Sequence, residues 1–330
     1  MVCVGIPHSR MHHQTRKYLE SLIAKWSRPR AHDSLHAIHV DLNASTGMYW
    51  LVSSWVILER LSGGQTDAVM AEHMREFVLK QIDTHGNFRL DEHNGFLRTL
   101  SLVQTVLMLF EEGNPVREEL LNRVGTDTLT FVEAHFPQNI PFFFDMRGMY
   151  CLVLILRLSG HFGCLLQAHR DFILDYVFRS QALLGGFGAG PASEAHGGYT
   201  FCAVATLKLL GASVPHENRL LVWLGVRLSQ FNGRPGKPRD SCYCWWVGAT
   251  LANLGRMDLI DFEKMNRFLN HHCLVPSGGF SKFPSVPLDD DSVHGPQEAD
   301  LFHTFLSLAS LALMNDQIDP ATVIPRSGCV

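Results

Sequence analysis

Residues 147–160 read RGMYCLVLILRLSG: a polar start, an aromatic residue, and an apolar run that ends in Ser-Gly. Apolar positions this continuous, over several helical turns, indicate a helix that is buried nearly all round. Five other segments share the pattern, and successive starts lie about 50 residues apart, a period typical of helical-hairpin repeats. The six segments begin at Thr46, Asn94, Arg147, His196, Asp240 and Asp300.

The stretches between these segments predict a second set of helices, with apolar residues at i, i+3, i+4 and i+7 and charges on the opposite side. Examples are 68–82, 117–136, 169–184 and 261–274. Two of them are followed by Gly-Gly-Phe, which suits a helix C-cap and a tight turn. One repeat is therefore a pair of helices, a buried inner one and an amphipathic outer one.

This pattern predicts an all-α fold, an α/α toroid (a six-fold α-α barrel) of helical-hairpin repeats. An open helical solenoid is the alternative. Closure is favoured because inner helices this apolar would not tolerate one face in water. In a toroid the polar starts of the inner helices converge on one funnel, where a site is expected. We expect a single domain over 1–330, with an N-terminal helix at about 10–27 and an insertion loop at about 285–299.

Composition narrows the class of protein. Hydrophobic residues make up 46% and charged residues 18% of the 330 residues, which excludes intrinsic disorder. The net charge of −4 favours neither nucleic acid nor an anionic membrane, so an anion site must be a local basic cluster. The longest apolar run, 149–156, is far shorter than the roughly 20 residues of a membrane span.

Targeting and redox features favour the cytoplasm. The N-terminal residues lack the apolar region of a secretory signal, and Cys329 does not form a prenylation box. The eight cysteines are scattered, mostly in apolar stretches, so we expect reduced thiols rather than a disulfide framework.

The segment GRPGKPRDSCYCWW, residues 233–246, contains several residues that could bind a ligand or a metal. Basic residues stand directly before an expected helix whose first turn carries Asp240, Cys242 and Tyr243. Basic side chains beside a helix N-terminus form a ready anion site. The basic residues are Arg234, Lys237 and Arg239.

Three of the converging residues suit a metal. Asp240, Cys242 and His303 would offer oxygen, sulfur and nitrogen, a set that fits zinc with a fourth position open. Asp-x-Cys alone is a weak signal, and His303 equally fits a core histidine bonded to a backbone carbonyl. His196 and Tyr199 also face the expected funnel, where a capping turn with a packed tyrosine is the plainer interpretation. A basic mouth above an aromatic-rich interior fits a long hydrocarbon with an anionic head.

The chain resembles the β subunits of protein prenyltransferases over about residues 40–320. The resemblance is carried by EAHGGYTFCAVATL, GRPGKPRDSCYCWWVGATL, GGFSKFP and DLFHT. It implies an α/α barrel that binds one catalytic zinc through Asp240, Cys242 and His303, and that works as a heterodimer with a helical-repeat α subunit. The implied diphosphate site comprises His196, Arg234, Lys237 and Tyr243, and the implied isoprenoid and peptide cavity includes Arg147, Tyr150, Cys202 and Trp246.

Two positions favour the type I geranylgeranyl enzymes. Farnesyl enzymes resemble this chain but have a tryptophan at the cavity floor, where this sequence has Thr46, so a 20-carbon chain is expected to fit. Farnesyl and Rab-type enzymes have a magnesium-holding aspartate at the position of Lys282, which type I enzymes replace by lysine. The resemblance thus implies that Lys282 acts catalytically without Mg²⁺. Geranylgeranyl diphosphate and the Cys-aliphatic-aliphatic-Leu tails of small GTPases are then the substrates.

Alternatives remain open at this point. The segments MYW at 48–50, WWV at 245–247 and DLFHTFLSLASLALM are closer to the Rab-type enzymes, so a Rab-type or farnesyl β subunit is the second choice. A non-catalytic toroid scaffold would be marked by a broken zinc set or a lost basic cluster, and neither is broken here. A terpene cyclase needs an acidic motif aimed into the cavity, whereas the Asp run at 289–291 falls in an expected loop.

Overall fold

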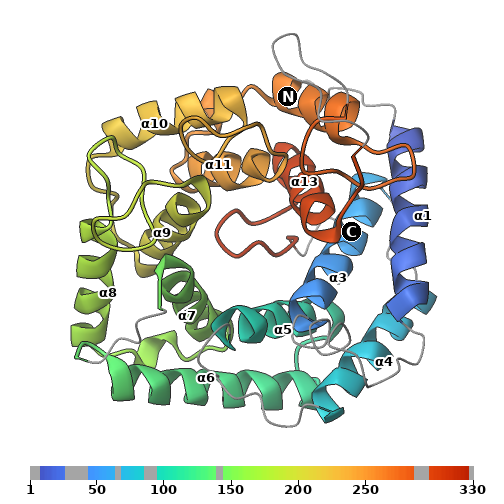
Figure 1. Cartoon of the computed structure of the whole chain (residues 1–330). Coiled ribbons are helices and arrows are strands. Elements are labelled where there is room, and N and C mark those ends of the chain that lie inside the picture. Colours follow the sequence, from blue (N-terminus) through green and yellow to red (C-terminus); the bar gives the residue numbers. More distant parts are fainter. Residues whose placement is uncertain are drawn as a thin grey trace, which may run out of the picture.

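Two concentric layers of helices form a closed ring (Figure 1). The computed structural model describes residues 8–26, 44–63, 68–84, 95–138, 144–285 and 297–326. Within these ranges each inner helix packs on the next, and the last packs on the first, so the ring closes. The inner helices are α3 (Ala44–Leu61), α5 (Gly95–Leu109), α7 (Met146–Leu158), α9 (Gly197–Leu210), α11 (Cys242–Asn253) and α13 (Leu301–Met314). The predicted toroid is confirmed, and the open solenoid is wrong.

The outer layer covers this ring with amphipathic helices. It comprises α4 (Ala68–Thr84), α6 (Pro115–His135), α8 (Gln167–Arg179), α10 (Glu217–Gln230) and α12 (Phe262–Arg267), which continues into a π-helical segment, Phe268–Cys273. The helix expected at 169–184 ends at Arg179 because the chain turns there: Ala182 N donates to the carbonyl of Gly186, and Gly185 has φ 108°. Helix α1 (His8–Trp26) packs on α3 from outside.

Burial explains why the two layers differ in composition. In α7 every residue from Met149 to Leu156 is buried, whereas α10 buries one side through Leu220, Leu224 and Leu228. Apolar side chains fill the space between the layers, which is the main stabilising contribution to the fold. Among the described residues, β structure is limited to isolated bridges, and no helix is long and apolar enough to cross a membrane.

A repeated hydrogen bond brings the starts of three inner helices to the same end of the ring. The backbone N–H of His196 donates to the carbonyl of Phe187, that of Asp240 to Phe231, and that of Asp300 to Phe280, at 3.0, 2.8 and 3.3 Å. These residues therefore hold equivalent positions in successive repeats. Each also presents a side-chain acceptor to a backbone N–H in the first turn of its own helix.

The chain returns to the centre of the ring after α13, in the segment 315–326 (Figure 1). Since this segment starts where α13 ends, it enters from the end opposite to the helix starts. Side chains of four inner helices donate to consecutive carbonyls of the segment. The pairs are Asn253 with Pro320, Tyr150 with Ala321, Gln104 with Thr322 and Tyr49 with Val323, at 2.7–2.9 Å.

Two expectations fall partly outside the described residues. The start of the second repeat at Asn94 is one of them. The insertion expected at about 285–299 is described only at 285 and 297–299, so the acidic run at 289–291 lies outside the described part of the chain.

Candidate metal centre

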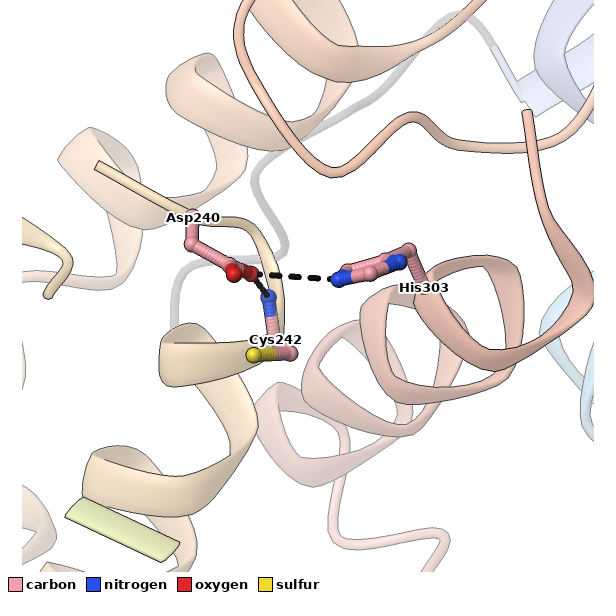
Figure 2. A group of neighbouring side chains, drawn as sticks. All are labelled: Asp240, Cys242 and His303. Atoms are coloured by element: carbon pink, nitrogen blue, oxygen red, sulfur yellow. Dashed lines mark hydrogen bonds and ion pairs between the residues drawn. The ribbon is translucent and has the colours of Figure 1, made fainter. Parts of the chain in front are cut away.

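The structure brings Asp240, Cys242 and His303 together (Figure 2). Asp240 lies two residues before Cys242, the first residue of α11, and His303 lies in the first turn of α13, the neighbouring inner helix. The candidate ligand atoms, an aspartate oxygen, Sγ and a histidine nitrogen, all lie within 4.8 Å of one another. The three residues are buried, at 7%, 5% and 8% exposure. The packing of α11 on α13 thus joins two motifs that are 60 residues apart.

Hydrogen bonds fix the orientation of His303. Its Nδ1 lies 2.6 Å from Oδ2 of Asp300, and its Nε2 lies 3.3 Å from Oδ1 of Asp240. A carboxylate at Nδ1 holds one proton there, so Nε2 is the nitrogen that a metal would bind, in exchange for the second proton. Burial lowers the pKa of His303, but the bonds to Asp240 and Asp300 outweigh this effect and raise the pKa to about 9.

The pKa values of Asp240 and Cys242 are also shifted by their shared surroundings. Burial raises the pKa of the Asp240 carboxyl, but hydrogen bonds from His303 and Cys242 bring it below its ordinary value. The pKa of the Cys242 thiol is well above its ordinary value because the thiol is buried and faces Asp240. A cation at this position would satisfy a carboxylate and a thiolate at once, so the cluster could hold a metal.

This donor set fits zinc. One oxygen, one sulfur and one nitrogen, with a fourth position left open, is the ligand pattern of a catalytic rather than a structural zinc site. Asp300 adds the outer carboxylate that commonly orients a zinc-bound histidine. Sequence reasoning did not single out Asp300 as a candidate site residue, although its place three residues before His303, at the N-cap of α13, was a usable signal.

Lys282 lies beside the same cluster. Ser241, between Asp240 and Cys242, donates its N–H to the carbonyl of Lys282 and its hydroxyl to that of Ser281, at 2.9 and 2.8 Å. The ammonium of Lys282 is 4.0 Å from Oδ2 of Asp240 and its side chain is half exposed. The segment therefore offers a fixed positive charge next to the expected metal.

His196 and Tyr243 form a second pair at this end of the ring. The Nδ1 atom of His196 accepts from Gly198 N at 3.1 Å, and its Nε2 is 2.9 Å from the hydroxyl of Tyr243. Burial and the nearby Arg234 lower the pKa of His196. The imidazole is therefore neutral with its proton on Nε2, and it donates to Tyr243. Burial raises the pKa of Tyr243, so its hydroxyl keeps its proton. This proton is then free to point to a ligand.

The basic segment forms a loop between α10 and α11. Arg234 pairs with Glu194 at 2.7 Å, and Lys237 is exposed. Gly233 lies against Tyr243: a Cβ at Gly233 would come within 2.2 Å of the tyrosine ring. The carbonyl of Gly233 accepts from Gly197 N at 2.8 Å, which joins the loop to the start of α9.

The residues predicted to line a cavity have two different environments. Trp246 is partly exposed and Arg147 is exposed; Arg147 binds Asp145, and its guanidinium lies over the Tyr199 ring. Aromatic contacts connect Trp246 to Phe302 and Phe201. Tyr150, Cys202 and Thr46 are buried, at 6%, 6% and 5% exposure. The hydroxyl of Tyr150 binds the central C-terminal segment, a contact that the sequence did not reveal.

Comparison with known proteins agrees with this architecture. The family described as prenyltransferase alpha-alpha toroid domain matches residues 13–326. The chain is similar in fold to Candida albicans protein geranylgeranyltransferase-I complexed with GGPP, with a TM-score of 0.71, 19% identity and 96% of each chain covered.

Curated relatives include three kinds of prenyltransferase β subunit. The type-1 geranylgeranyl transferase subunit beta of Arabidopsis thaliana is 32% identical over 188 residues, which cover 52% of this chain and 46% of the relative. The type-2 subunit beta of Saccharomyces cerevisiae is 29% identical over 312 residues, covering 88% and 87%. The protein farnesyltransferase subunit beta of Schizosaccharomyces pombe is 34% identical over 191 residues, covering 51% and 46%.

The match to the type-1 relative thus spans about half of that relative's length. The family match covers nearly all of the described helices. The chain therefore belongs to the prenyltransferase α-α toroid domain family, within which it resembles the β subunits of protein prenyltransferases.

Proposed function

We propose that the chain is the catalytic β subunit of a zinc-dependent protein geranylgeranyltransferase of type I. It would act in the cytoplasm with an α subunit, and transfer a geranylgeranyl group from geranylgeranyl diphosphate to the cysteine of Cys-aliphatic-aliphatic-Leu tails of small GTPases. The observation that carries the proposal is the buried Asp240–Cys242–His303 cluster at the end of the ring that also carries the basic loop.

The reaction joins a thiol to an allylic carbon. A C–S bond forms between the substrate cysteine and C1 of the lipid, the C1–O bond to the diphosphate breaks, and the thiol proton leaves to solvent. Asp240, Cys242 and His303 would hold zinc, and a bound zinc would lower the pKa of the substrate thiol so that a thiolate is available at neutral pH. Asp300, which contacts Nδ1 of His303, would hold a proton on that nitrogen and leave Nε2 to bind the metal.

Basic side chains of the chain and the hydroxyl of Tyr243 would bind the leaving diphosphate. Negative charge grows on the diphosphate as the C–O bond breaks, and donors that are already in place stabilise it without reorganisation. Arg234, Lys237, Lys282 and Tyr243 would supply this charge and hydrogen bonding. His196 contributes through Tyr243, because its Nε2 proton occupies a lone pair of the hydroxyl and leaves the hydroxyl proton for the diphosphate.

Two residues support the geranylgeranyl type. Thr46 is a small side chain in the first turn of α3, where farnesyl enzymes resemble this chain but have a tryptophan, so more room is left for the lipid. Lys282, with its ammonium 4.0 Å from Asp240, would take the place of Mg²⁺ on the leaving group, so Mg²⁺ would not be required.

The test is a transfer assay on the full chain purified with its α subunit. A fluorescent peptide that ends in Cys-aliphatic-aliphatic-Leu is incubated with the 15- or the 20-carbon diphosphate, and the product is identified by mass. A thioether formed preferentially from the 20-carbon donor is expected. Hydrocarbon product from the donor alone would indicate a terpene cyclase instead. A folded, zinc-loaded protein that modifies neither the peptide nor a GTPase bound to an escort protein would indicate a scaffold.

A Rab-type enzyme is the second candidate, favoured by the similarity to the yeast type-2 subunit over 88% of this chain. The same assay separates the two. A Rab-type enzyme would require an escort protein bound to the GTPase substrate, whereas the type I enzyme would modify the short peptide alone.

A further inference from the structure

The loop that carries Arg234 and Lys237 is built differently from its counterparts in the neighbouring repeats. Phe187, Phe231 and Phe280 are equivalent, since each carbonyl accepts the N–H at the start of the next inner helix. Gly-Gly precedes Phe187 and Phe280 but not Phe231. The left-handed turn that Gly185 and Gly278 make in the other repeats is made here by Phe231 itself, at φ 48°. A non-glycine residue in this region is strained, so other contacts must hold the loop.

A buried arginine supplies the first of these contacts. Arg227, in the last turn of α10, is 5% exposed, and its Nη1 donates to Oδ1 of Asn232 at 2.7 Å. Its guanidinium lies over the Trp223 ring, and its Nε has no hydrogen-bond partner among the described residues. Burial lowers the pKa of Arg227. Because a buried charge is costly unless it is hydrogen-bonded, Arg227 holds Asn232 firmly in one orientation.

Asn232 passes this restraint to the basic loop. It is 4% exposed, and its Nδ2 donates to the carbonyl of Lys237 at 3.0 Å and to Oε1 of Gln230 at 3.1 Å. The bond to Lys237 closes residues 232–237 into a loop, with Arg234 inside it. On the other side the loop is joined to α9 through Gly233. The Asn232 side chain therefore decides where the backbone of Lys237 lies relative to Gly233.

We propose that Asn232, held by Arg227, is a positioning residue that pre-forms the loop 232–237 for a diphosphate group. This inference rests on the proposed function, in which Arg234 and Lys237 receive the leaving diphosphate. A loop that is already closed loses less conformational entropy when it binds an anion, so binding is tighter than to an open loop carrying the same charges. Asn232 touches no ligand in this account and acts only through the backbone of Lys237.

The experiment measures the affinity of the full chain, purified with its α subunit, for inorganic diphosphate by calorimetry at constant ionic strength. Asn232→Ala removes the bridge to Lys237 and leaves the loop's charges unchanged, so a loss of affinity of about 5- to 20-fold is expected. Asn253→Ala is the matched control, because Asn253 is also buried and also donates to a backbone carbonyl, at Pro320. It also removes a buried hydrogen bond to the backbone, but it should leave diphosphate affinity within about twofold.

A double-mutant cycle separates positioning from general destabilisation. In a Lys237→Ala background, Asn232→Ala should cost less than it does in the wild type, because only Arg234 of the two cations placed by the loop remains. Arg227→Met replaces a buried charge by an apolar chain of similar length. It serves as a second variant if Asn232→Ala does not fold, and it should also lower the affinity for diphosphate.

Equal affinity of wild type and Asn232→Ala, or losses that add fully in the double variant, would overturn the inference while leaving the proposed function intact. A wild type that does not bind diphosphate would instead overturn the proposed function and the inference with it.

Discussion

Asp300 Oδ2 lies 2.6 Å from Nδ1 of His303, on the far side of the imidazole from Asp240. The same carboxylate caps α13 through Oδ1, which accepts from His303 N at 2.9 Å. One side chain thus begins the helix and selects the histidine tautomer that can bind a metal through Nε2.

Asp300→Asn should weaken zinc binding without unfolding the chain. Asparagine retains one oxygen for the helix cap, but its amide group then faces Nδ1 and favours the tautomer with the proton on Nε2, which blocks the metal. We expect zinc affinity to fall about 10- to 100-fold, as for other outer partners of zinc-bound histidine. Competition with a chromophoric chelator measures the change, and an affinity equal to that of wild type would contradict the role assigned to Asp300.

Cys242→Ala should abolish zinc binding, whereas Cys244→Ala should not. Both thiols are buried at the start of α11, but Cys242 alone of the two belongs to the cluster with Asp240 and His303. We expect about one zinc per chain in wild type and in Cys244→Ala, and about none in Cys242→Ala. Elemental analysis of the purified proteins measures this, with circular dichroism confirming that each variant is folded. Zinc retained in Cys242→Ala would place the metal elsewhere.

Lys282→Asp should make prenyl transfer depend on Mg²⁺. The substitution removes an ammonium next to Asp240 and puts a carboxylate in its place, so a divalent cation is needed to neutralise the diphosphate. We expect the variant's activity without Mg²⁺ to drop about 10-fold or more and to recover when Mg²⁺ is added. Titration of kcat with Mg²⁺ in wild type and variant is the measurement. An identical Mg²⁺ response in the two proteins would argue against the type I assignment.

Thr46→Trp should shift donor preference to the 15-carbon lipid. Thr46 is 5% exposed in the first turn of α3, so an indole at this position must take up space inside the ring. We expect the ratio of kcat/KM for the 20- and 15-carbon donors to fall by about 10-fold or more. Thr46→Ser, which adds no volume, serves as the control and should keep the wild-type ratio. An unchanged ratio in Thr46→Trp would show that Thr46 does not limit lipid length.

The lowered pKa of His196 predicts that the free energy of unfolding decreases on acidification. Burial and Arg234 lower its pKa in the folded chain, while the unfolded chain has the ordinary value of about 6.5. As the pH falls below about 6.5, the unfolded state binds more protons, so the free energy of unfolding decreases until the lower folded pKa is passed. Above about 6.5 the stabilising contribution is complete.

His196→Asn isolates this effect, because asparagine also caps a helix but does not titrate. The difference in free energy of unfolding between wild type and variant should shrink from about pH 7.5 to about pH 5.5, as measured by denaturant unfolding at each pH. A difference that stays constant, or grows on acidification, would contradict a neutral His196 that accepts from Gly198.

The sequence alone determined the helical repeat and indicated most of the candidate site residues. Helix formation and burial depend on local spacing of apolar residues, so the run at 149–156 was enough to place an inner helix. The motif around Asp240 and Cys242 was equally local, because both residues lie at one helix start. The end of the third outer helix was placed too late, since the turn at Gly185 depends on contacts with α10.

Tertiary structure decided everything that depends on the angle between helices. The apolar inner helices favoured closure, but the contacts by which α13 packs on α3 depend on rotations accumulated over all the repeats. The bond of Tyr150 to Ala321 and that of Asn232 to Lys237 both end on backbone carbonyls. Every residue has a carbonyl, so side-chain patterns do not show which one will be in reach. Asp300 became a candidate site residue only when α13 brought His303 against Asp240, because a carboxylate can select a ligand tautomer only where the other ring nitrogen faces a site.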